Sequence, residues 1–390
     1  MMLKSASTAL LIAVSAVASQ VQAVALYRSA TRNTTEPTGT YADSGWQYQM
    51  NIGNFSGTPI GPHAFVMASH IAAGVGHNFT WNSQTYTVTS ATTVPGTTDL
   101  ALLTVNNTFP KFAAVYNQTT DGSFDGKTMV MFGRGTARGN EIRLATAPRP
   151  GENTLRGWEW GTFDSVRSWG TNNIVGVTAN GTANSNNYIY YFFNATGGTP
   201  EEATLTSGDS GGGAFVKAPD GVWKLVSTNS AVEATFRYTQ TGSNFDASIF
   251  DKGNLWESFD RGLTYQQIGD TVADQPTIGL LNNVTYYANA LAPFIPKPGD
   301  ATLDGKVNTQ DFNLFAGHFG ASSYNWADGD FNHDGLVNSI DFNLYKANYG
   351  FIGTPPAGAT LSAASAVPEP ATGALVVLAA IAGLRRSRRH

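Results

Sequence analysis

The sequence predicts a mainly β protein followed by a small α-helical module, and two observations support this fold class. From Val24 to Asp274, short β-branched and aromatic runs alternate with clusters of Gly, Asn and Pro, as in β-barrels and sandwiches. From residue 298 to 350, a polar loop followed by aromatic residues at helical spacing occurs twice. Hydrophobic residues make up 42% of the chain, enough for a core, and 42 glycines supply turns.

Composition and charge exclude several classes of function. Charged residues are only 13% of the 390 residues, about half the usual share of a soluble domain. The net charge is −5 although four arginines stand at the C-terminal end, so the body is acidic and a nucleic-acid partner is not expected. The absence of cysteine excludes disulfides, cysteine-bound zinc and thiol catalysis. Stability must therefore come from the core or from bound metal.

The first 23 residues have the pattern of a secretory signal peptide. Lys4 precedes an apolar run from Ala9 to Ala18, and Val21-Gln-Ala23 supplies a small-residue cleavage site. The alternative is a buried N-terminal helix. We expect an exported protein, at the cell envelope or surface or outside the cell.

The expected strands of residues 24–274 are short and closely spaced, which is typical of a barrel or sandwich. They are Gln47–Ile52, Thr85–Ser90, Leu100–Val105, Thr128–Phe132, Tyr188–Phe193, Gly213–Val216 and Val222–Thr228.

A glycine-rich segment containing a serine interrupts these strands. In Gly208-Asp-Ser210-Gly-Gly212, flanking glycines allow a tight turn that exposes the Ser210 hydroxyl. The neighbouring N–H groups then point inward and can bind a developing oxyanion. Taken alone, the segment could equally be a hairpin turn.

A serine hydroxyl needs a nearby base, and the base needs an orienting carboxylate. His70 ends an apolar strand that begins at Phe65, whereas His63 and His77 lie among turn formers and are expected at the surface. Asp99 directly precedes the apolar run Leu100-Ala-Leu-Leu, where a buried carboxylate must be hydrogen-bonded. The alternative is that Asp99 only ends a turn.

Together, Ala68-Ser-His70, Asp99-Leu-Ala-Leu-Leu and Gly208-Asp-Ser210-Gly-Gly resemble the motifs of the trypsin/chymotrypsin-like serine peptidases, in the same order. The resemblance implies a two-β-barrel fold for residues 24–274 and a secreted serine endopeptidase that needs no cofactor for its chemistry. It implies that His70 is general base and then acid, that Asp99 orients it, and that Ser210 forms the acyl-enzyme. The Gly208 and Ser210 N–H groups would bind the oxyanion.

The chain departs from the family's pattern at several positions. Ser69 replaces the usual alanine before His70, and Thr204 replaces the aspartate that selects Arg or Lys. Ser230 resembles the residue of the substrate-side strand that supports the aspartate. Val232 stands where a glycine is usual and would narrow the substrate pocket toward small apolar side chains.

In the family, the residue at Asp209 pairs with a newly cut N-terminus. Cleavage after Ala23 would expose Val24, so activation by signal removal is a hypothesis. A non-catalytic surface protein that binds or scaffolds through a peptidase-like domain is the main alternative function. Esterase activity is a lesser one. A metallopeptidase is not expected, because no histidine pair has zinc-binding spacing.

The repeat near the C-terminus has calcium-binding spacing. Asp300 to Asp311 and Asp330 to Asp341 both carry oxygen-bearing side chains at loop positions 1, 3, 5, 9 and 12, with glycine at position 6. Calcium requires such hard oxygen ligands and a sharp glycine turn. After each loop, aromatic residues recur at helical spacing. These are Phe312, Phe315 and Phe319, and then Phe342, Tyr345 and Tyr349.

Two loop–helix units resemble a type I dockerin domain at residues 298–350, which implies two Ca²⁺ ions and a cohesin-like partner. The ligands implied are Asp300, Thr302, Asp304, Lys306 (backbone), Asn308 and Asp311 for one ion, and Asp330, Asn332, Asp334, Leu336 (backbone), Asn338 and Asp341 for the other. Thr302 departs from the usual Asn or Asp and would weaken the first site. The alternative is that the aromatic faces pack on each other and calcium only stabilises a small domain.

The remaining segments are expected to connect and to target. Residues 275–297 are predicted to be a linker, one that its aromatic residues Tyr286, Tyr287 and Phe294 could pack against the β domain rather than leave free. Residues 351–366 are predicted to be a flexible spacer. Val367-Pro-Glu-Pro370, the 14 mostly apolar residues Ala371–Leu384 and the arginines after them resemble a PEP-CTERM sorting signal at residues 367–390. That resemblance implies an exosortase-type processing enzyme and transient or permanent anchoring by a transmembrane segment. A simple tail anchor is the alternative.

Overall fold

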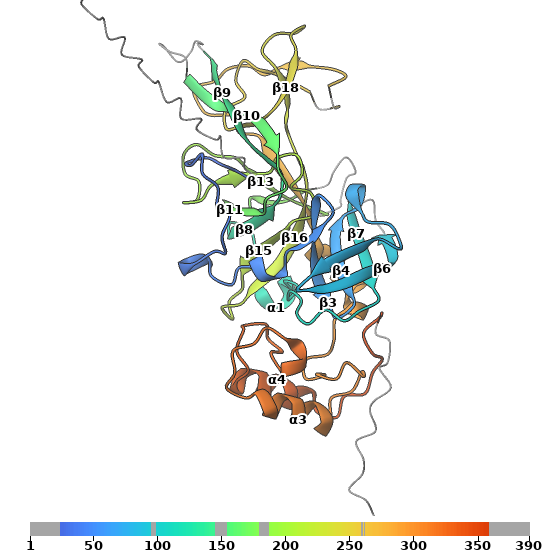
Figure 1. Cartoon of the computed structure of the whole chain (residues 1–390). Helices are drawn as coiled ribbons and strands as arrows, with labels where there is room; N and C mark the ends of the chain where they lie inside the picture. The colour runs from blue at the N-terminus through green and yellow to red at the C-terminus, as the bar shows by residue number, and fades with distance from the viewer. Residues whose placement is uncertain are drawn as a thin grey trace, which may run out of the picture. The chain divides into compact units, whose positions relative to one another are not determined.

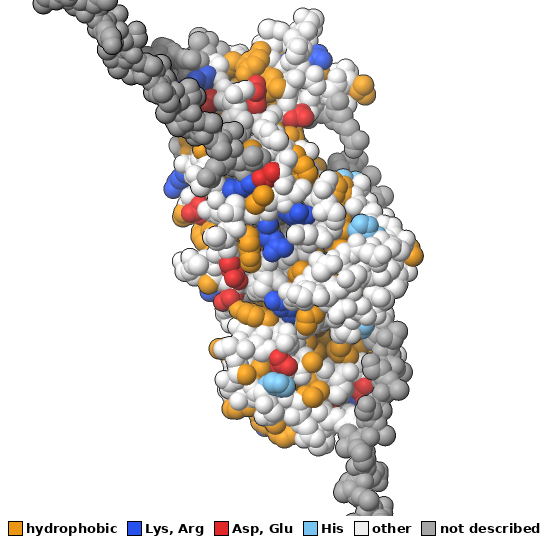
Figure 2. All heavy atoms as spheres, in the orientation of Figure 1, with side chains coloured by type: hydrophobic (Ala, Val, Ile, Leu, Met, Phe, Trp, Pro, Cys, Tyr) orange, Lys and Arg blue, Asp and Glu red, His pale blue; other side chains and the backbone are white. Residues whose placement is uncertain are grey.

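The computed structural model describes residues 24–94, 99–144, 154–178, 187–258, 260 and 262–358, and it is mainly β (Figure 1). The predicted signal peptide and sorting tail lie outside these residues. No helix among the described residues is long and apolar enough to cross a membrane. Charged side chains are sparse on the face drawn in Figure 2, in keeping with the 13% of charged residues.

The first large sheet is antiparallel and barrel-like. Its six strands, in order across the sheet, are β2 (Met50–Ile52), β3 (Phe55–Gly61), β4 (Ala64–Ala68), β7 (Leu100–Val105), β6 (Gln84–Thr93) and β5 (Asn78–Trp81). The edge strands β2 and β5 also contact each other. Alternate strand side chains, including Phe65 and Leu103, fill the interior together with Phe109 from the segment after β7. Burial of this apolar surface is the main favourable term in folding.

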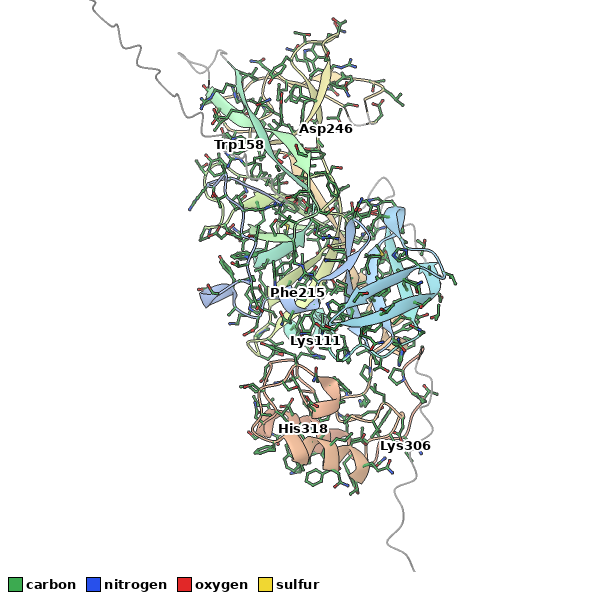
Figure 3. The ribbon with its side chains drawn as sticks, viewed as in Figure 1. Lys111, Trp158, Phe215, Asp246, Lys306 and His318 are labelled. Atoms are coloured by element: carbon green, nitrogen blue, oxygen red, sulfur yellow. The ribbon has the colours of Figure 1, made fainter. Side chains whose placement is uncertain are left out.

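The second large sheet has seven strands. In order they are β11 (Ser168–Asn173), β8 (Thr128–Gly133), β15 (Gly213–Lys217), β16 (Trp223–Val232), β21 (Ile278–Asn283), β13 (Tyr188–Phe192) and β12 (Gly176–Thr178). Phe215 is fully buried in a core shared with Val66 and Leu100 of the first sheet and is labelled in Figure 3. This shared core holds the two sheets together.

Two smaller sheets complete the β body. One pairs β1 (Ala25–Leu26) with β14 (Ala203–Thr204). The other, which we call the outer sheet, runs β20 (Gln266–Gln267), β19 (Trp256–Glu257), β17 (Thr235–Arg237), β18 (Asn244–Ile249), β10 (Thr154–Phe163) and β9 (Thr136–Leu144). In Figure 1 its strands β9, β10 and β18 extend beyond the seven-stranded sheet. Trp158, labelled in Figure 3, packs in an aromatic cluster at its base.

Four short helices lie in the described residues, and two follow the acidic loops. These are α1 (Gln118–Asp121), α2 (Ala288–Leu291), α3 (Thr309–His318) and α4 (Ser339–Asn348). Asn308 and Asn338 cap α3 and α4 in reciprocal capping boxes with Asp311 and Asp341, which satisfy the free N–H groups of each first turn. The aromatic faces pack together, with Phe312 and Tyr345 ring centroids 5.6 Å apart.

The predicted linker contains a regular strand that the sequence did not predict. Strand β21 lies within residues 275–297 and is a central strand, paired with both β13 and β16. The sequence did not predict this strand, because its own apolar pattern is short and its conformation is set by hydrogen bonding to a strand on each side. The described part of the predicted spacer is also held in place, since Gly353 N donates to Gly305 O (2.8 Å) and Ala357 N to Pro293 O (2.8 Å).

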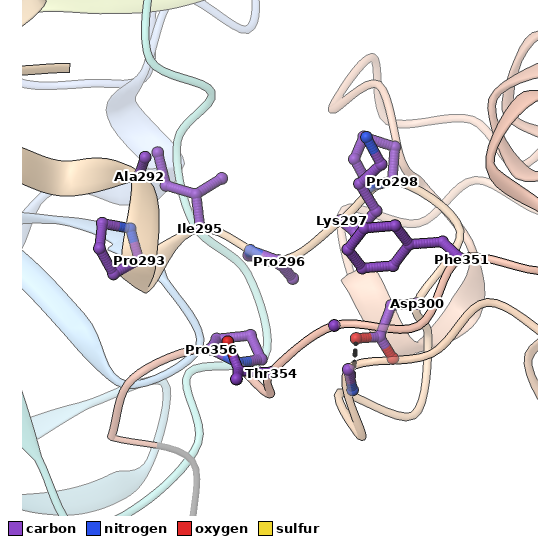
Figure 4. A pocket seen from close by; sticks show the side chains of 12 residues that line it. Ala292, Pro293, Ile295, Pro296, Lys297, Pro298, Asp300, Phe351, Thr354 and Pro356 are labelled. Carbon is purple, nitrogen blue, oxygen red and sulfur yellow. Dashed lines mark hydrogen bonds between the residues drawn. The ribbon is translucent and has the colours of Figure 1, made fainter. Parts of the chain in front are cut away.

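Figure 4 shows the place where these two segments run side by side. They line an open pocket of about 330 Å³, whose lining includes four prolines and Phe351. Lys297 lies over the Phe351 ring, and the Asp300 carboxylate accepts a hydrogen bond from Gly305 N. Segment 351–358 is therefore part of the folded module.

Candidate active site

Strand pairing brings His70 and Asp99 together. Strands β4 and β7 pair with Ala68 opposite Leu100, so the residues just after β4 and just before β7 are neighbours. His70 lies in a single 3-10 turn, Ser69–Ile71, and its Nδ1 is 2.7 Å from Asp99 Oδ2. The apolar strands that the sequence indicated thus fix both groups at one end of the first sheet.

The Asp99 carboxylate is surrounded by donors. Besides the His70 ring, it accepts hydrogen bonds from His70 N (2.9 Å), Ser69 Oγ (3.0 Å) and Ser230 Oγ (2.7 Å). Burial alone would raise the pKa of Asp99, but the hydrogen bonds from His70 and Ser230 outweigh it and hold the pKa below its usual value. Asp99 is therefore ionised at neutral pH and can orient His70.

A β-bulge aims Ser230 at this carboxylate. Strand β16 pairs with β21 at Asn229–Leu281 and Ala231–Leu280, so Ser230 is an extra residue. Bulges commonly re-aim a side chain beside an active site. Asn282 of β21 donates its side-chain N–H to Asp99 O at 3.0 Å, and β21 thereby supports the site from within the predicted linker.

Ser210 lies in the loop between β14 and β15, three residues before β15 of the second large sheet. Its Oγ is 2.9 Å from His70 Nε2. The loop is held tightly, because a Cβ on Gly212 would lie 1.9 Å from Phe132 O. His70 remains partly open to solvent, with 45% of its side chain exposed. The structure therefore brings the three residues that the sequence singled out into one hydrogen-bonded row.

The loop before Ser210 presents unused donors. Gly208 has φ +96°, a conformation that suits glycine alone. Among the described residues, no group accepts a hydrogen bond from the N–H of Gly208 or of Ser210. Both N–H groups are thus free to bind a negatively charged oxygen.

A cleft of about 350 Å³ contains His70 and Ser210. Ser230 and Val232, which the sequence assigned to the substrate pocket, line this cleft. Thr204 does not line it and is a correction. Its side chain is fully buried, with Oγ1 3.3 Å from Tyr191 Oη, because Ala203–Thr204 pairs with β1.

Asp209 binds the start of the described chain. Its buried carboxylate accepts hydrogen bonds from Val24 N (3.3 Å), Thr206 N (2.7 Å), Thr206 Oγ1 (3.0 Å) and Gly135 N (2.8 Å). Burial raises the pKa of Asp209 to about 6, against the effect of these hydrogen bonds. No cation neutralises Asp209 among its described partners.

The acidic loops are organised differently from each other. Carboxylate oxygens of Asp330, Asp334 and Asp341 all lie within 4.8 Å of one another, a donor set that suits a hard cation such as Ca²⁺. Among the described residues, Asp300, Asp304 and Asp311 do not form such a group. There, Thr302 Oγ1 donates to Asp311 Oδ1 at 2.8 Å.

Burial, reinforced by repulsion from neighbouring carboxylates, raises the pKa of Asp330 to about 8 and that of Asp300 to about 7. A bound cation would neutralise this repulsion.

Sequence reasoning missed several features. Ser69 was taken only as a departure, yet it donates to Asp99. Trp160 lines the cleft although nothing in its local pattern marked it, because β10 reaches the site only through tertiary pairing.

The burial of His63 also differs from the prediction. His63, expected at the surface, is 3% exposed. Its Nε2 lies 3.2 Å from Thr108 Oγ1, since the turn it occupies is covered by segment 106–109.

Comparison with known proteins gives a structural likeness only. No family model matches the chain, and no curated protein matches it. Among solved structures, the chain is similar to the secreted serine protease VesC from Vibrio cholerae. The TM-score is 0.37 and the identity 11%, over 66% of this chain and 47% of that one. The chain thus spans about half the length of the protein it matches.

Proposed function

We propose that this protein is a secreted serine endopeptidase with a chymotrypsin-like two-barrel domain. The observation that carries the proposal is the row Asp99–His70–Ser210, with separations of 2.7 and 2.9 Å, next to the free N–H groups of Gly208 and Ser210. A nucleophile, a base and an orienting carboxylate in this geometry are suited to acyl transfer.

In the proposed reaction, His70 Nε2 takes the Ser210 proton as Oγ attacks the peptide carbonyl carbon. The carbonyl oxygen becomes an oxyanion bound by the Gly208 and Ser210 N–H groups. His70 then gives its proton to the leaving amine, and the acyl-enzyme remains. Water, deprotonated by His70, attacks the ester carbonyl, and His70 returns this proton to Ser210 Oγ as the acid leaves. Asp99 stabilises the imidazolium in both halves.

The other modules of the proposal are those expected from the sequence. Asp330, Asp334 and Asp341 would hold Ca²⁺, with Asn332, Asn338 and the Leu336 carbonyl, and the ion would neutralise carboxylates that repel each other. The Asp300 loop would hold a second ion. We further propose that this dockerin-like module binds a cohesin-like partner and that residues 367–390 direct the protein to the envelope through an exosortase-type enzyme.

The test uses the exported protein in calcium buffer with a fluorophosphonate probe, and mass spectrometry to locate the adduct. We expect an adduct on Ser210 that is absent from Ser210→Ala and strongly reduced in His70→Ala. A folded, calcium-loaded protein that begins at Val24 and gains no adduct would overturn the proposal. That result would favour a non-catalytic binding protein instead.

A further inference from the structure

Strand β10 has an irregular register beside the cleft. It pairs with β9 at Trp158–Glu141, Trp160–Arg138 and Phe163–Thr136, so the pairing shifts on both sides of Trp160. The second shift leaves one extra residue in β10, which places Trp160 and Phe163 on the same face although they are three residues apart. Trp158, two residues before Trp160 in the same strand, packs into the cluster at the base of the outer sheet.

Both aromatic residues on this face reach the reactive loop. Trp160 lines the cleft that contains His70 and Ser210. Phe163 lies against Gly208, where an added Cβ would come within 2.3 Å of the Phe163 ring. The Trp160 indole N–H donates to Ser248 Oγ at 3.0 Å, which fixes the orientation of the ring and leaves its apolar surface toward the cleft.

The described lining of the cleft offers no charge to a substrate side chain. Apart from His70, its one ionisable member is Asp209, which is 1% exposed and already bound by four donors. Leu205, Ala231 and Val232 supply apolar surface beside Trp160. A charged substrate side chain would lose its hydration there without a partner.

We infer that Trp160 determines specificity and that the substrates are peptides with a large apolar or aromatic side chain within two residues of the cleaved bond, in place of the small apolar side chain that Val232 alone suggested from the sequence. The inference rests on the proposed function and deepens it. An indole face held by Ser248 recognises such a side chain by apolar contact and by ring stacking. The outer sheet thereby acts as a substrate-recognition element, because its strand β10 positions Trp160 at the cleft.

The experiment profiles cleavage sites in a peptide library with the exported, calcium-loaded protein and its Trp160→Ala variant. We expect one position near the cleaved bond to favour Phe, Tyr, Trp or Leu over Ala. Trp160→Ala should reduce that preference about tenfold, through KM more than kcat, with little change for peptides carrying Ala. Trp160→Phe should keep most of the preference.

The matched control is Tyr238→Ala. Tyr238 is an exposed aromatic residue next to β17 of the same sheet, its ring centroid lies 4.7 Å from that of Phe245, and it does not line the cleft. It should leave the preference unchanged. Fluorophosphonate labelling of Ser210 distinguishes failure of this specificity inference from failure of the proposed peptidase activity. Labelling with an unchanged preference in Trp160→Ala, or a preference for charged residues, overturns this inference alone. No labelling of Ser210 in the unmodified protein overturns the proposed function as well.

Discussion

At the scale of single residues, the site depends on how many donors surround one carboxylate. Asp99 accepts four hydrogen bonds from three residues, Ser69, His70 and Ser230. A carboxylate with this many donors stays ionised and cannot rotate freely. Its orientation fixes the His70 ring with Nε2 toward Ser210, which is the geometry that proton transfer needs.

Removing one hydrogen-bond donor to Asp99 should therefore slow the proposed reaction moderately, and removing the charge of Asp99 should slow it much more. Ser230→Ala removes one hydrogen bond to a charged group, so we expect kcat to fall about tenfold and the pKa of Asp99 to rise. Asp99→Asn should reduce kcat by roughly 10⁴. Ser227→Ala is the control, because Ser227 Oγ lies in the same strand and has no partner among the described residues. Steady-state rates on one peptide check these changes, and an Asp99→Asn rate within tenfold of the unmodified protein contradicts them.

The pairing of Asp209 with Val24 gives a pH-dependent prediction. With residues still attached before Val24, the folded pKa of Asp209 is about 6, above its ordinary value. Ionisation then opposes folding, so that form should lose on the order of 2 to 3 kcal/mol of stability between about pH 4 and pH 6. In a protein that begins at Val24, the new ammonium group neutralises Asp209, lowers its pKa and removes the loss.

Cleavage of the bond before Val24 should also relieve backbone strain at this residue. Val24 has φ +50°, a conformation that a β-branched residue rarely adopts. Urea unfolding of both forms across this pH range measures the difference. Asp209→Asn in both forms is the control and should abolish it. Equal pH dependence of the two unsubstituted forms would exclude the pairing as an activation device.

At the scale of elements, arginine side chains connect segments in a chain without cysteine. Arg138 of β9 donates to the carbonyls of Leu26 (3.0 Å) and Ser29 (2.8 Å) and stacks on Trp158 at 3.5 Å. Arg134 in the same way binds Gly53 O at 2.9 Å and Phe55 O at 3.1 Å. Each guanidinium offers several donors in a fixed plane, so one side chain satisfies carbonyls of a distant segment.

Arg138→Met should therefore loosen the N-terminal segment. The carbonyls of Leu26 and Ser29 lose their donor in a partly buried place, which we expect to destabilise the fold by about 2 kcal/mol. Hydrogen exchange of residues 25–29 should rise more than that of β15. Arg143→Met is the matched control, because Arg143 lies in the same strand and pairs with the exposed Glu141. Equal effects of the two substitutions would mean that the carbonyl contacts contribute nothing.

Prediction from the sequence succeeded where an element's own pattern decides its structure. Leu100–Val105 is the observed strand β7, and Thr128–Phe132 lies within β8. The glycine-rich segment around Ser210 and the helix after each acidic loop were also visible, because glycine spacing and helical periodicity are local signals. Elements that depend on distant partners were missed, among them β21 and the bulge that turns Ser230 toward Asp99.

At the scale of the whole molecule, the acidic-loop module shares its core with the β body. Phe112, in the connection after β7, is 1% exposed and belongs to the module's core with Trp326 and Phe331. Its ring centroid is 5.2 Å from those of Trp326 and His333. His333 lies within the second acidic loop, between Asn332 and Asp334. The conformation of that loop is thus coupled to the β body through one aromatic residue.

Removal of calcium should consequently weaken the β body as well as the module. Without the ion, Asp330, Asp334 and Asp341 repel one another, the second loop opens, and Phe112 loses its packing. Chelation should lower the melting temperature of the exported protein by roughly 10 °C and speed hydrogen exchange in β15 and β16. Phe112→Ala should uncouple the two parts, so that chelation no longer affects β15 and β16 beyond the effect of the substitution itself.

Asp330→Asn removes one of the three carboxylates that would hold the ion, so it should lower the melting temperature in calcium buffer and leave little further effect for chelation. Asp125→Asn makes the same charge change at an exposed site and should do neither. If chelation loosens only residues 298–350 in the unsubstituted protein, the Phe112 contact does not transmit the effect. If it loosens both parts in the unsubstituted protein but only residues 298–350 in Phe112→Ala, the acidic-loop module stabilises the β body through this aromatic contact.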